Sequence, residues 1–336
     1  MPNTKLHEKY DVALLDLDGV VYIGGEPIPS APGALHKAKQ AGMRLAYVTN
    51  NASRTPAAVA SLLSAMDVPA DPADVVTSAQ AAARLLADKL PPRARVLVIG
   101  STALRLAVRE RGLTPVSTAA DEPAAVVQGY GPGIGYGILA EGGLAVRKGA
   151  LFVGTNADST LPGPRGIQPG NGSLLQVIAY ATGTSPIIAG KPEPPLHRES
   201  VIRTGAKNPL VVGDRLDTDI EAAHRAGADS LLVLTGVSHP ADVVLAPPRQ
   251  RPTYIAETLD ALLQEYPDVT RADDGVTCGG WTAARTESGE LTLRGSGEAI
   301  DGLRAVAVAT WASPGTTTAE QIDASLATLK DNGLRI

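Results

Sequence analysis

The chain has few aromatic residues, and it has no excess of basic charge. Phenylalanine, tyrosine and tryptophan make up 3% of its 336 residues, and Phe152 is the single phenylalanine. A nucleic-acid surface built on stacked aromatic rings is therefore not expected. The 30 basic residues are outnumbered by 35 acidic ones, and a net charge of −5 gives no general attraction to a polyanion. We therefore expect no nucleic-acid partner.

Cysteine and long apolar segments are also scarce. The lone cysteine, Cys278, excludes a disulfide framework and a zinc site built from cysteines, and it suits a reducing cytosol. Residues 1–11 are polar and lack the apolar centre of a secretory signal. The longest uncharged stretch, 166–190, is interrupted by Pro, Asn, Gln and several Gly, so no membrane insertion is expected. These features predict a cytoplasmic globular protein, and a homo-oligomer is compatible with them.

Apolar runs near the N-terminus follow the order strand, helix, strand. A hydrophobic content of 44% is ample for a buried core. Residues 12–15 and 45–48 predict buried strands, and residues 31–42 between them predict a helix. The same order returns late in the chain, with strands at 210–212 and 231–234 around a helix. Such units are typical of a parallel sheet with a Rossmann-like arrangement.

Between these two parts lies an alanine-rich stretch of alternating helices and strands. It predicts an α/β cap domain inserted into the first domain. The strands are expected at 96–99, 125–128 and 151–154, and the helices at 79–90, 103–112 and 173–181. The predicted boundaries are 1–77 and 188–262 for the catalytic core and 78–187 for the cap. Glycines at every second position from 129 to 137 do not open a helix as a dinucleotide loop does, and they predict a flexible surface loop.

The composition changes after Pro247-Pro248. From residue 269 onward the chain reads as a small appended α+β module, residues 269–336. Short strands are predicted at 276–284, 290–293 and 305–310, followed by a helix at 318–330. The fold class is therefore α/β: a Rossmann-like parallel-sheet core, an inserted α/β cap domain and a small C-terminal α+β module.

Polar side chains stand directly after several of the predicted strands. Each has an ordinary local interpretation: a turn or cap residue, an acid in the first turn of a helix, or a solvated lysine. In a parallel sheet, however, the carboxyl ends of the strands meet at one edge, and ligands bind there. Together they predict one site at that edge. Its members are Asp16, Asp18, Thr49, Asn50, Lys191 and Asp214.

These residue types suit the hydrolysis of phosphate monoesters, which enzymes accelerate by up to ~10²¹-fold. A carboxylate that approaches a phosphate is repelled by about 4 kcal/mol per pair of unit charges at about 4 Å. Mg²⁺ held by Asp16 and Asp214 would offset this repulsion. Lys191 and Thr49 could bind the phosphate oxygens, and Asp18 could protonate the leaving alkoxide.

At these residues the sequence resembles the haloacid dehalogenase-type phosphatases. The motifs that carry the resemblance are Asp-Leu-Asp-Gly-Val at 16–20, Thr-Asn-Asn at 49–51, Gly-Lys-Pro at 190–192 and Gly-Asp-Arg-Leu-Asp-Thr-Asp at 213–219. Residues 154–158 and 169–173 are similar to signatures of the type C2a cap of p-nitrophenyl phosphatases, phosphoglycolate phosphatases and pyridoxal phosphatase. The resemblance covers residues 10–250.

The resemblance implies a Mg²⁺-dependent phosphomonoester hydrolase that forms an aspartyl-phosphate on Asp16. Asp18 would be the acid/base and lend its backbone carbonyl to the metal, Asp214 would be the third protein ligand, and Asp219 would hold a metal-bound water. Thr49, Asn50 and Lys191 would bind phosphate. The substrate-binding residues would be Asn51, Arg54 and Leu161.

Two positions depart from the family pattern. Tyr130-Gly131 stands where the family often has Phe-Asp, which affects a cap contact. Asp217 stands where Glu is common, an exchange expected to be harmless.

Leu161 bears on the substrate, a small phosphorylated metabolite. Members similar to pyridoxal phosphatase have His at that position, whereas Leu matches the phosphoglycolate and glycerol-phosphate branch. Glycerol 3-phosphate is therefore expected, with 2-phosphoglycolate or a general p-nitrophenyl phosphatase activity as alternatives. Ordinary core packing is the competing interpretation of Leu161.

Two further alternatives remain open at this point. A protein that binds a phosphorylated ligand without turning it over could use the same fold. The C-terminal module weakly resembles part of an acetyltransferase-like fold, in which residues 294–297 would be the pyrophosphate-binding loop. A packing or self-association role for the module is favoured.

Overall fold

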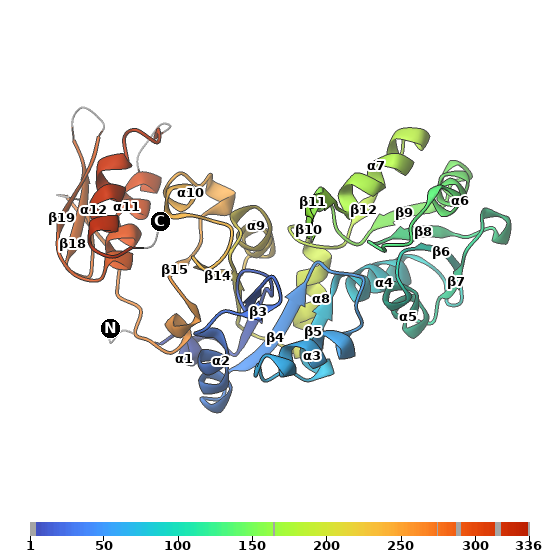
Figure 1. Ribbon diagram of the computed structural model, residues 1–336, viewed down its shortest axis with the longest axis horizontal. Coiled ribbons are helices and arrows are strands. Elements are labelled where there is room, and N and C mark those ends of the chain that lie inside the picture. The colour runs from blue at the N-terminus through green and yellow to red at the C-terminus, as the bar shows by residue number, and fades with distance from the viewer. Residues whose placement is uncertain (1–4, 164, 274, 287–289, 313–316, 335–336) are drawn as a thin grey trace. The chain divides into compact units, whose positions relative to one another are not determined.

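In the computed structural model, the chain divides into two compact units, residues 1–45 with 208–336 and residues 46–207. Figure 1 shows the elements in chain order. The structure describes residues 5–163, 165–273, 275–286, 290–312 and 317–334. Parts of the polar N-terminus and of the predicted C-terminal module lie outside the described residues, namely 1–4, 274, 287–289, 313–316 and 335–336.

Parallel strands form the centre of the first unit, in the order β15-β14-β13-β1. These are β1 (Val12–Leu15), β13 (Pro209–Gly213), β14 (Asp229–Val233) and β15 (Tyr254–Ala256). All of β1 and the last four residues of β13 are buried, as expected for parallel strands covered on both faces. The strands predicted at 12–15 and 210–212 are confirmed.

The helices of this unit begin and end at the predicted signals. Helix α2 (Ala31–Gln40) has a proline in its first turn and is followed by Gly42, whose φ is +93°. After β13, the predicted helix starts as a π-helical turn (Leu216–Ile220) and continues as α9 (Glu221–Ala226). The remaining elements are α1 (Leu6–Lys9), β2 (Tyr22–Ile23), β3 (Glu26–Pro27), α10 (Pro240–Val244) and 3₁₀ turns at Pro248–Gln250 and Leu259–Leu262.

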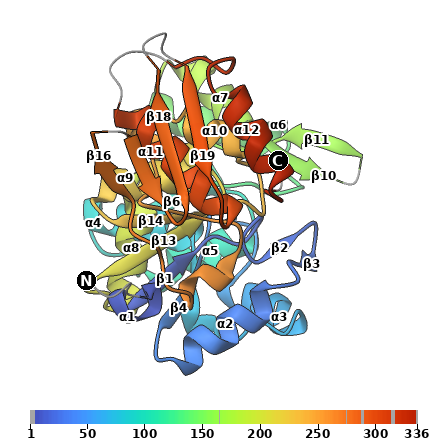
Figure 2. The same ribbon diagram turned by 90° about the vertical axis from the view of Figure 1, so that its left-hand side faces the viewer.

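The C-terminal module is an antiparallel sheet with two helices. Its strands are β16 (Thr270–Ala272), β17 (Gly275–Cys278), β18 (Trp281–Arg285) and β19 (Leu291–Gly295), paired in chain order. Its helices are α11 (Ala299–Ala312) and α12 (Asp323–Asp331). Helix α11 packs against the sheet and against α10. Figure 2 looks onto this sheet, with β18 and β19 toward the viewer.

Two predictions for the module were wrong. Residues 305–310 are not a strand but part of α11. The prediction failed because this helix is buried on nearly all sides, so its alternating Ala and Val residues show no helical periodicity. The strand predicted at 276–284 is a hairpin of β17 and β18, joined by Gly279-Gly280. A two-glycine hairpin turn fits the φ of +58° at Gly279.

The second unit contains its own parallel sheet, in the order β12-β9-β8-β6-β7. Its strands are β6 (Arg95–Ile99), β7 (Thr114–Val116), β8 (Ala125–Gln128), β9 (Leu151–Gly154) and β12 (Ile187–Ile188), with an antiparallel hairpin of β10 (Thr160–Gly163) and β11 (Gly166–Pro169). Strand β4 (Arg44–Thr49), which begins in the first unit, pairs with β5 (Val75–Thr77). The helices are α3 (Pro56–Ala65), α4 (Ser78–Lys89), α5 (Thr102–Glu110), α6 (Tyr136–Arg147), α7 (Asn171–Thr182) and α8 (Pro194–Thr204).

The glycine run is only partly the predicted surface loop. The loop joins β8 to α6, but Gly129 and Gly131 are buried and Gly137 already belongs to α6. A Cβ atom on Gly131 would lie 3.2 Å from the carbonyl carbon of Gly100. The backbone therefore approaches a neighbouring loop closely where the family often carries aspartate.

No helix among the described residues is long and apolar enough to cross a membrane.

Candidate active site

Two acidic residues, Asp16 and Asp18, follow the C-terminal end of β1. The backbone N–H of Asp16 donates to the carbonyl of Val212 on β13 (2.8 Å), so the main chain continues the parallel pairing just beyond β1. Asp16 is half-buried and Asp18 is exposed. The hydroxyl of Tyr22 donates to Oδ2 of Asp18 at 3.4 Å. The two acids are thus held at the point where the strand turns into a loop.

Residues 214–219, named the acidic loop here, follow β13. Asp214 and Asp219 are each 1% exposed. Oδ2 of Asp214 accepts the backbone N–H of Val237 (2.7 Å), and Oδ2 of Asp219 accepts the N–H of Arg215 (3.2 Å). Asp217 instead faces outward and forms an exposed ion pair with Arg215 (2.8 Å). An acid of either length can make that surface pair, in line with a harmless exchange at this position.

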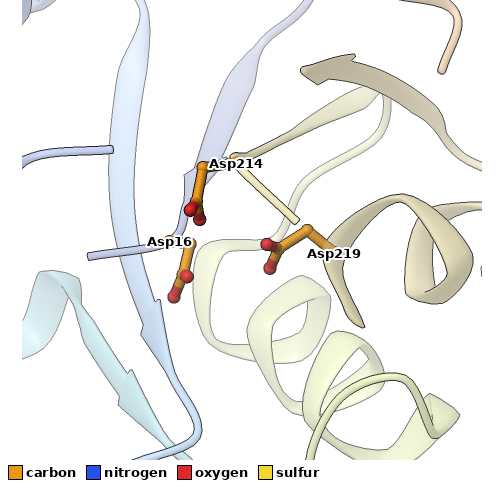
Figure 3. A group of neighbouring side chains, drawn as sticks. All are labelled: Asp16, Asp214 and Asp219. Atoms are coloured by element: carbon orange, nitrogen blue, oxygen red, sulfur yellow. The ribbon is translucent and has the colours of Figure 1, made fainter. Parts of the chain in front are cut away.

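Asp16, Asp214 and Asp219 lie together. Each offers a carboxylate oxygen, and the three oxygens all lie within 4.8 Å of one another. Figure 3 shows the three side chains turned toward a common space. Two unit charges at this range repel by about 4 kcal/mol at an intermediate effective dielectric constant. Three carboxylates in this arrangement fit a hard divalent cation such as Mg²⁺, which prefers oxygen ligands.

Glycines allow this close approach. A Cβ atom on Gly19 would lie 2.3 Å from Oδ2 of Asp214, and one on Gly236 would lie 2.0 Å from the same atom. A Cβ atom on Gly213 would lie 2.2 Å from Cβ of Asp219. The backbone therefore packs directly against both buried carboxylates.

In the second unit, Asn50 connects two of the predicted motifs. Its Oδ1 accepts the backbone N–H of Lys191 (2.8 Å), and its Nδ2 donates to the carbonyl of Lys191 (3.2 Å). Its own carbonyl accepts the hydroxyl of Ser78 (2.6 Å) and the Nδ2 group of Asn156 (2.8 Å). The loops after β4 and before α8 are therefore joined through one amide side chain.

Thr49 and Lys191 are also brought together by these contacts. Lys191 is 7% exposed and Thr49 is 5% exposed. The Lys191 ammonium group donates to the carbonyl of Val48 (3.3 Å), next to Thr49, whose hydroxyl accepts the N–H of Asn51 (3.1 Å). A buried ammonium group close to a strand end suits the binding of phosphate oxygens.

The three predicted substrate-binding residues are less buried than Thr49 and Lys191. Asn51 is exposed, and its side chain accepts hydrogen bonds from the N–H and hydroxyl of Ser53 (both 2.7 Å). Arg54 is exposed in the same loop. Leu161 is half-buried on β10, opposite Gln168 of β11. The hairpin thus places Leu161 on a strand.

Sequence reasoning missed two groups of supporting residues. Val237 and Ser238 hold Asp214 through their backbone N–H groups, at Oδ2 and at the carbonyl oxygen respectively. Backbone donors in a loop leave no compositional signal. Asp158, which accepts from Nδ2 of Asn50 (3.2 Å), lies inside the quoted cap signature, and that signature was the signal that could have identified it.

Three family models match the chain. One described as haloacid dehalogenase-like hydrolase matches residues 13–114, and one described as HAD-hydrolase-like matches residues 188–262. A third, GCN5-related N-acetyltransferase like domain, matches residues 278–334. The first two matches contain all four motifs, and the third lies within the C-terminal module.

Relatives match over most of the chain. D-glycerol 3-phosphate phosphatase of Mycobacterium tuberculosis is 45% identical over 308 residues, covering 90% of this chain and 86% of its own. A crystal structure of glycerol phosphate phosphatase from M. tuberculosis in complex with magnesium has a TM-score of 0.88 at 42% identity and covers 98% and 99% of the two chains. A p-nitrophenyl phosphatase from Archaeoglobus fulgidus has a TM-score of 0.70 at 28% identity, covering 76% of this chain and 98% of that one.

Proposed function

This chain belongs to the haloacid dehalogenase-like hydrolases, and from that membership we propose that it is a Mg²⁺-dependent phosphatase of glycerol 3-phosphate. The main support for this choice of substrate is the 45% identity to D-glycerol 3-phosphate phosphatase over 90% of the chain. That similarity includes the inserted cap, the part that selects the substrate in this family. Leu161 on β10 is consistent with the same branch.

Three of the predicted residues are assigned to the metal. Asp16 and Asp214 would hold Mg²⁺ by their carboxylates and Asp18 by its backbone carbonyl, with Asp219 binding a metal-bound water. The clustered carboxylate oxygens of Asp16, Asp214 and Asp219 support this assignment. When bound, Mg²⁺ would offset the repulsion between the Asp16 carboxylate and the phosphate and orient the phosphate oxygens.

Thr49, Asn50 and Lys191 are assigned to phosphate binding. The ammonium group of Lys191 is held by the Val48 carbonyl, and its backbone is held by Asn50. A positive charge fixed in this way needs no rearrangement as charge develops in the transition state. Asn51, Arg54 and Leu161 remain proposals for contacts with the rest of the substrate.

The reaction proceeds by two displacements at phosphorus. The Asp16 carboxylate attacks the phosphorus atom, the bond to the glycerol oxygen breaks, and Asp18 gives its proton to the leaving alkoxide. A water molecule then gives a proton to Asp18 and attacks the aspartyl-phosphate. Inorganic phosphate leaves, and the Asp16 carboxylate and protonated Asp18 are restored.

We also propose a cytoplasmic location and no nucleic-acid partner. The net charge of −5 and the scarcity of aromatic residues support the second point. The single cysteine, Cys278, is a free thiol, which is compatible with a reducing compartment.

A panel of phosphomonoesters tests the proposal. Glycerol 3-phosphate, 2-phosphoglycolate, pyridoxal 5′-phosphate and p-nitrophenyl phosphate are compared by kcat/KM in Mg²⁺. We expect glycerol 3-phosphate to lead by about tenfold or more, a difference typical of a few contacts. Chelation with EDTA should abolish turnover, and added Mg²⁺ should restore it. Ca²⁺ should inhibit, because it takes more oxygen ligands at longer distances and can capture both oxygens of Asp16.

The alternatives give different results in the same assay. If 2-phosphoglycolate has the highest kcat/KM, it would replace glycerol 3-phosphate as the assigned substrate, and the proposed chemistry would stay the same. Binding of phosphate without turnover of any ester would support a non-catalytic phospho-ligand protein. Full activity with Ca²⁺ as the only metal would contradict the proposed attack by Asp16 with Mg²⁺ as the metal.

A further inference from the structure

The C-terminal module and the acidic loop share one hydrophobic core. Leu216 and Ile220, which flank Asp219 on the π-helical turn, belong to the same buried cluster as Leu303 and Val306 of α11. Ile220, Leu303 and Val306 are each 0% exposed. The α10 residues Val243 and Val244 also belong to this cluster. The module is therefore not a separately packed appendage.

Trp311, near the end of α11, is attached directly to α10. Its indole N–H donates to the carbonyl of Val243 (3.2 Å). The Arg251 guanidinium lies 5.7 Å from the centre of the Trp311 ring and donates to the Trp311 carbonyl (3.2 Å). Toward the other end of α11, Arg304 donates to the carbonyl of Ile255 on β15 (2.9 Å). The helix is thus fixed to α10 near one end and to β15 toward the other.

The segment before α10 holds Asp214. The backbone N–H groups of Val237 and Ser238 donate to Oδ2 (2.7 Å) and to the carbonyl oxygen (3.1 Å) of Asp214. The Ser238 hydroxyl accepts the N–H of Leu216 (3.2 Å). Helix α10 begins two residues later, at Pro240. A short path of contacts therefore runs from Trp311 through α10 to a buried carboxylate of the acidic cluster.

The residues of the module do not fit the acyl-CoA that an acetyltransferase-like fold implies. In such a fold, the loop at 294–297 and the start of α11 would face a pyrophosphate. Here Asp301, buried in the first turn of α11, places a carboxylate near that helix start, paired with Arg304. Arg294 and Gly295 are moreover the last residues of β19 and pair with Thr282 and Trp281 of β18, so this segment is not an open loop.

We propose that the C-terminal module supports the acidic loop, with Trp311 as a positioning residue that sets the location of Asp214 for Mg²⁺. This inference rests on the proposed function only in its choice of metal. Loss of the Trp311 hydrogen bond would loosen α10 and the 237–238 segment without altering any carboxylate. Mg²⁺ affinity should therefore weaken, while the acidic residues themselves remain in place.

The test compares two matched variants of the full-length chain. Trp311→Phe removes the N–H that crosses to α10. Trp281→Phe removes an indole N–H that donates to the Glu298 carbonyl (3.0 Å) inside the module. Mg²⁺ binding is measured without substrate, by calorimetry and by the rise of the Tm with Mg²⁺ concentration. Activity then gives the Mg²⁺ concentration for half-maximal rate.

We expect Trp311→Phe to raise the half-saturating Mg²⁺ concentration about fivefold, the effect of losing one ordinary hydrogen bond. Trp281→Phe should leave it unchanged even where its Tm is lower. Unchanged Mg²⁺ binding in Trp311→Phe, or an equal shift in both variants, would overturn the proposal. Binding of acetyl-CoA to the wild-type chain would contradict the statement that the module does not fit an acyl-CoA. Because calorimetry needs no turnover, a failure of the proposed phosphatase activity would be seen separately.

Discussion

Gly19 and Asp214 are packed so closely that a Cβ atom on residue 19 would lie 2.3 Å from Oδ2 of Asp214. Gly19 also has a φ of +81°, a region in which residues with a side chain are strained. Gly19→Ala should therefore displace the Asp214 carboxylate. We expect kcat/KM to fall by about 100-fold, as small misplacements of reacting groups do. Gly24→Ala is the control, because Gly24 also has a positive φ (+61°) but a Cβ atom there would meet nothing within 4 Å. A Gly19→Ala enzyme as active as Gly24→Ala would contradict the packing argument.

Leu161→His should change the choice of substrate. The half-buried Leu161 lies on β10, and the family resemblance implies His at this position in members similar to pyridoxal phosphatase. We expect the kcat/KM ratio of pyridoxal 5′-phosphate to glycerol 3-phosphate to rise by about tenfold. Ile167→His, on the exposed face of β11, is the control for a new imidazole on the same hairpin. An unchanged kcat/KM ratio would mean that residues of the cap other than Leu161 determine the choice of substrate.

A chain that ends at Glu265 should keep its phosphatase chemistry in saturating Mg²⁺, but it should need a higher Mg²⁺ concentration and lose stability. The p-nitrophenyl phosphatase from A. fulgidus is matched over 98% of its length by 76% of this chain, so a related chain exists without a counterpart to about a quarter of this one. Here, however, removal would expose Ile220 and Val243, which pack against α11. We expect a lower Tm and a tendency to aggregate in size-exclusion chromatography. Normal melting and size without any catalysis, even in saturating Mg²⁺, would instead place a residue that takes part in the reaction in the module.

The stability of the protein should fall in mild acid through His197. Burial lowers the pKa of His197 below its ordinary value of 6.5. The unfolded chain therefore binds a proton that the folded chain resists, and stability falls as the pH drops below about 6.5. His197→Gln should show a flatter dependence of the free energy of unfolding on pH between 7 and 5, measured by urea denaturation. Parallel curves for variant and wild type would contradict this assignment.

The carboxyl ends of the strands were predictable because the sequence signal there is local. Buried parallel strands read as short apolar runs, and Asp16 and Asp214 each stand directly after one, so their meeting at one edge follows from the topology. Residues 305–310 were wrongly predicted as a strand, because their sequence pattern does not distinguish a buried strand from a buried helix. Helix α11 is enclosed on nearly all sides, and an enclosed helix carries no amphipathic period to separate it from a buried strand.

The supporting contacts of the site could not be predicted. Asp214 is held by backbone N–H groups of Val237 and Ser238, and any residue but proline supplies such a donor. The attachment of Trp311 to Val243 depends on how the module docks, over a sequence separation that no local pattern encodes. The predicted domain boundaries at 77–78 and 187–188 remain predictions.

The central claim is that Asp16 is the nucleophile of a Mg²⁺-dependent phosphatase. It is tested most directly by the rate of inorganic phosphate release from glycerol 3-phosphate by Asp16→Asn and wild-type enzyme, purified identically in saturating Mg²⁺. An amide is no nucleophile toward phosphorus and a poor Mg²⁺ ligand, so kcat should fall by at least about 1,000-fold. Turnover by Asp16→Asn above a trace, in a preparation shown to be free of contaminating phosphatase, would contradict the account.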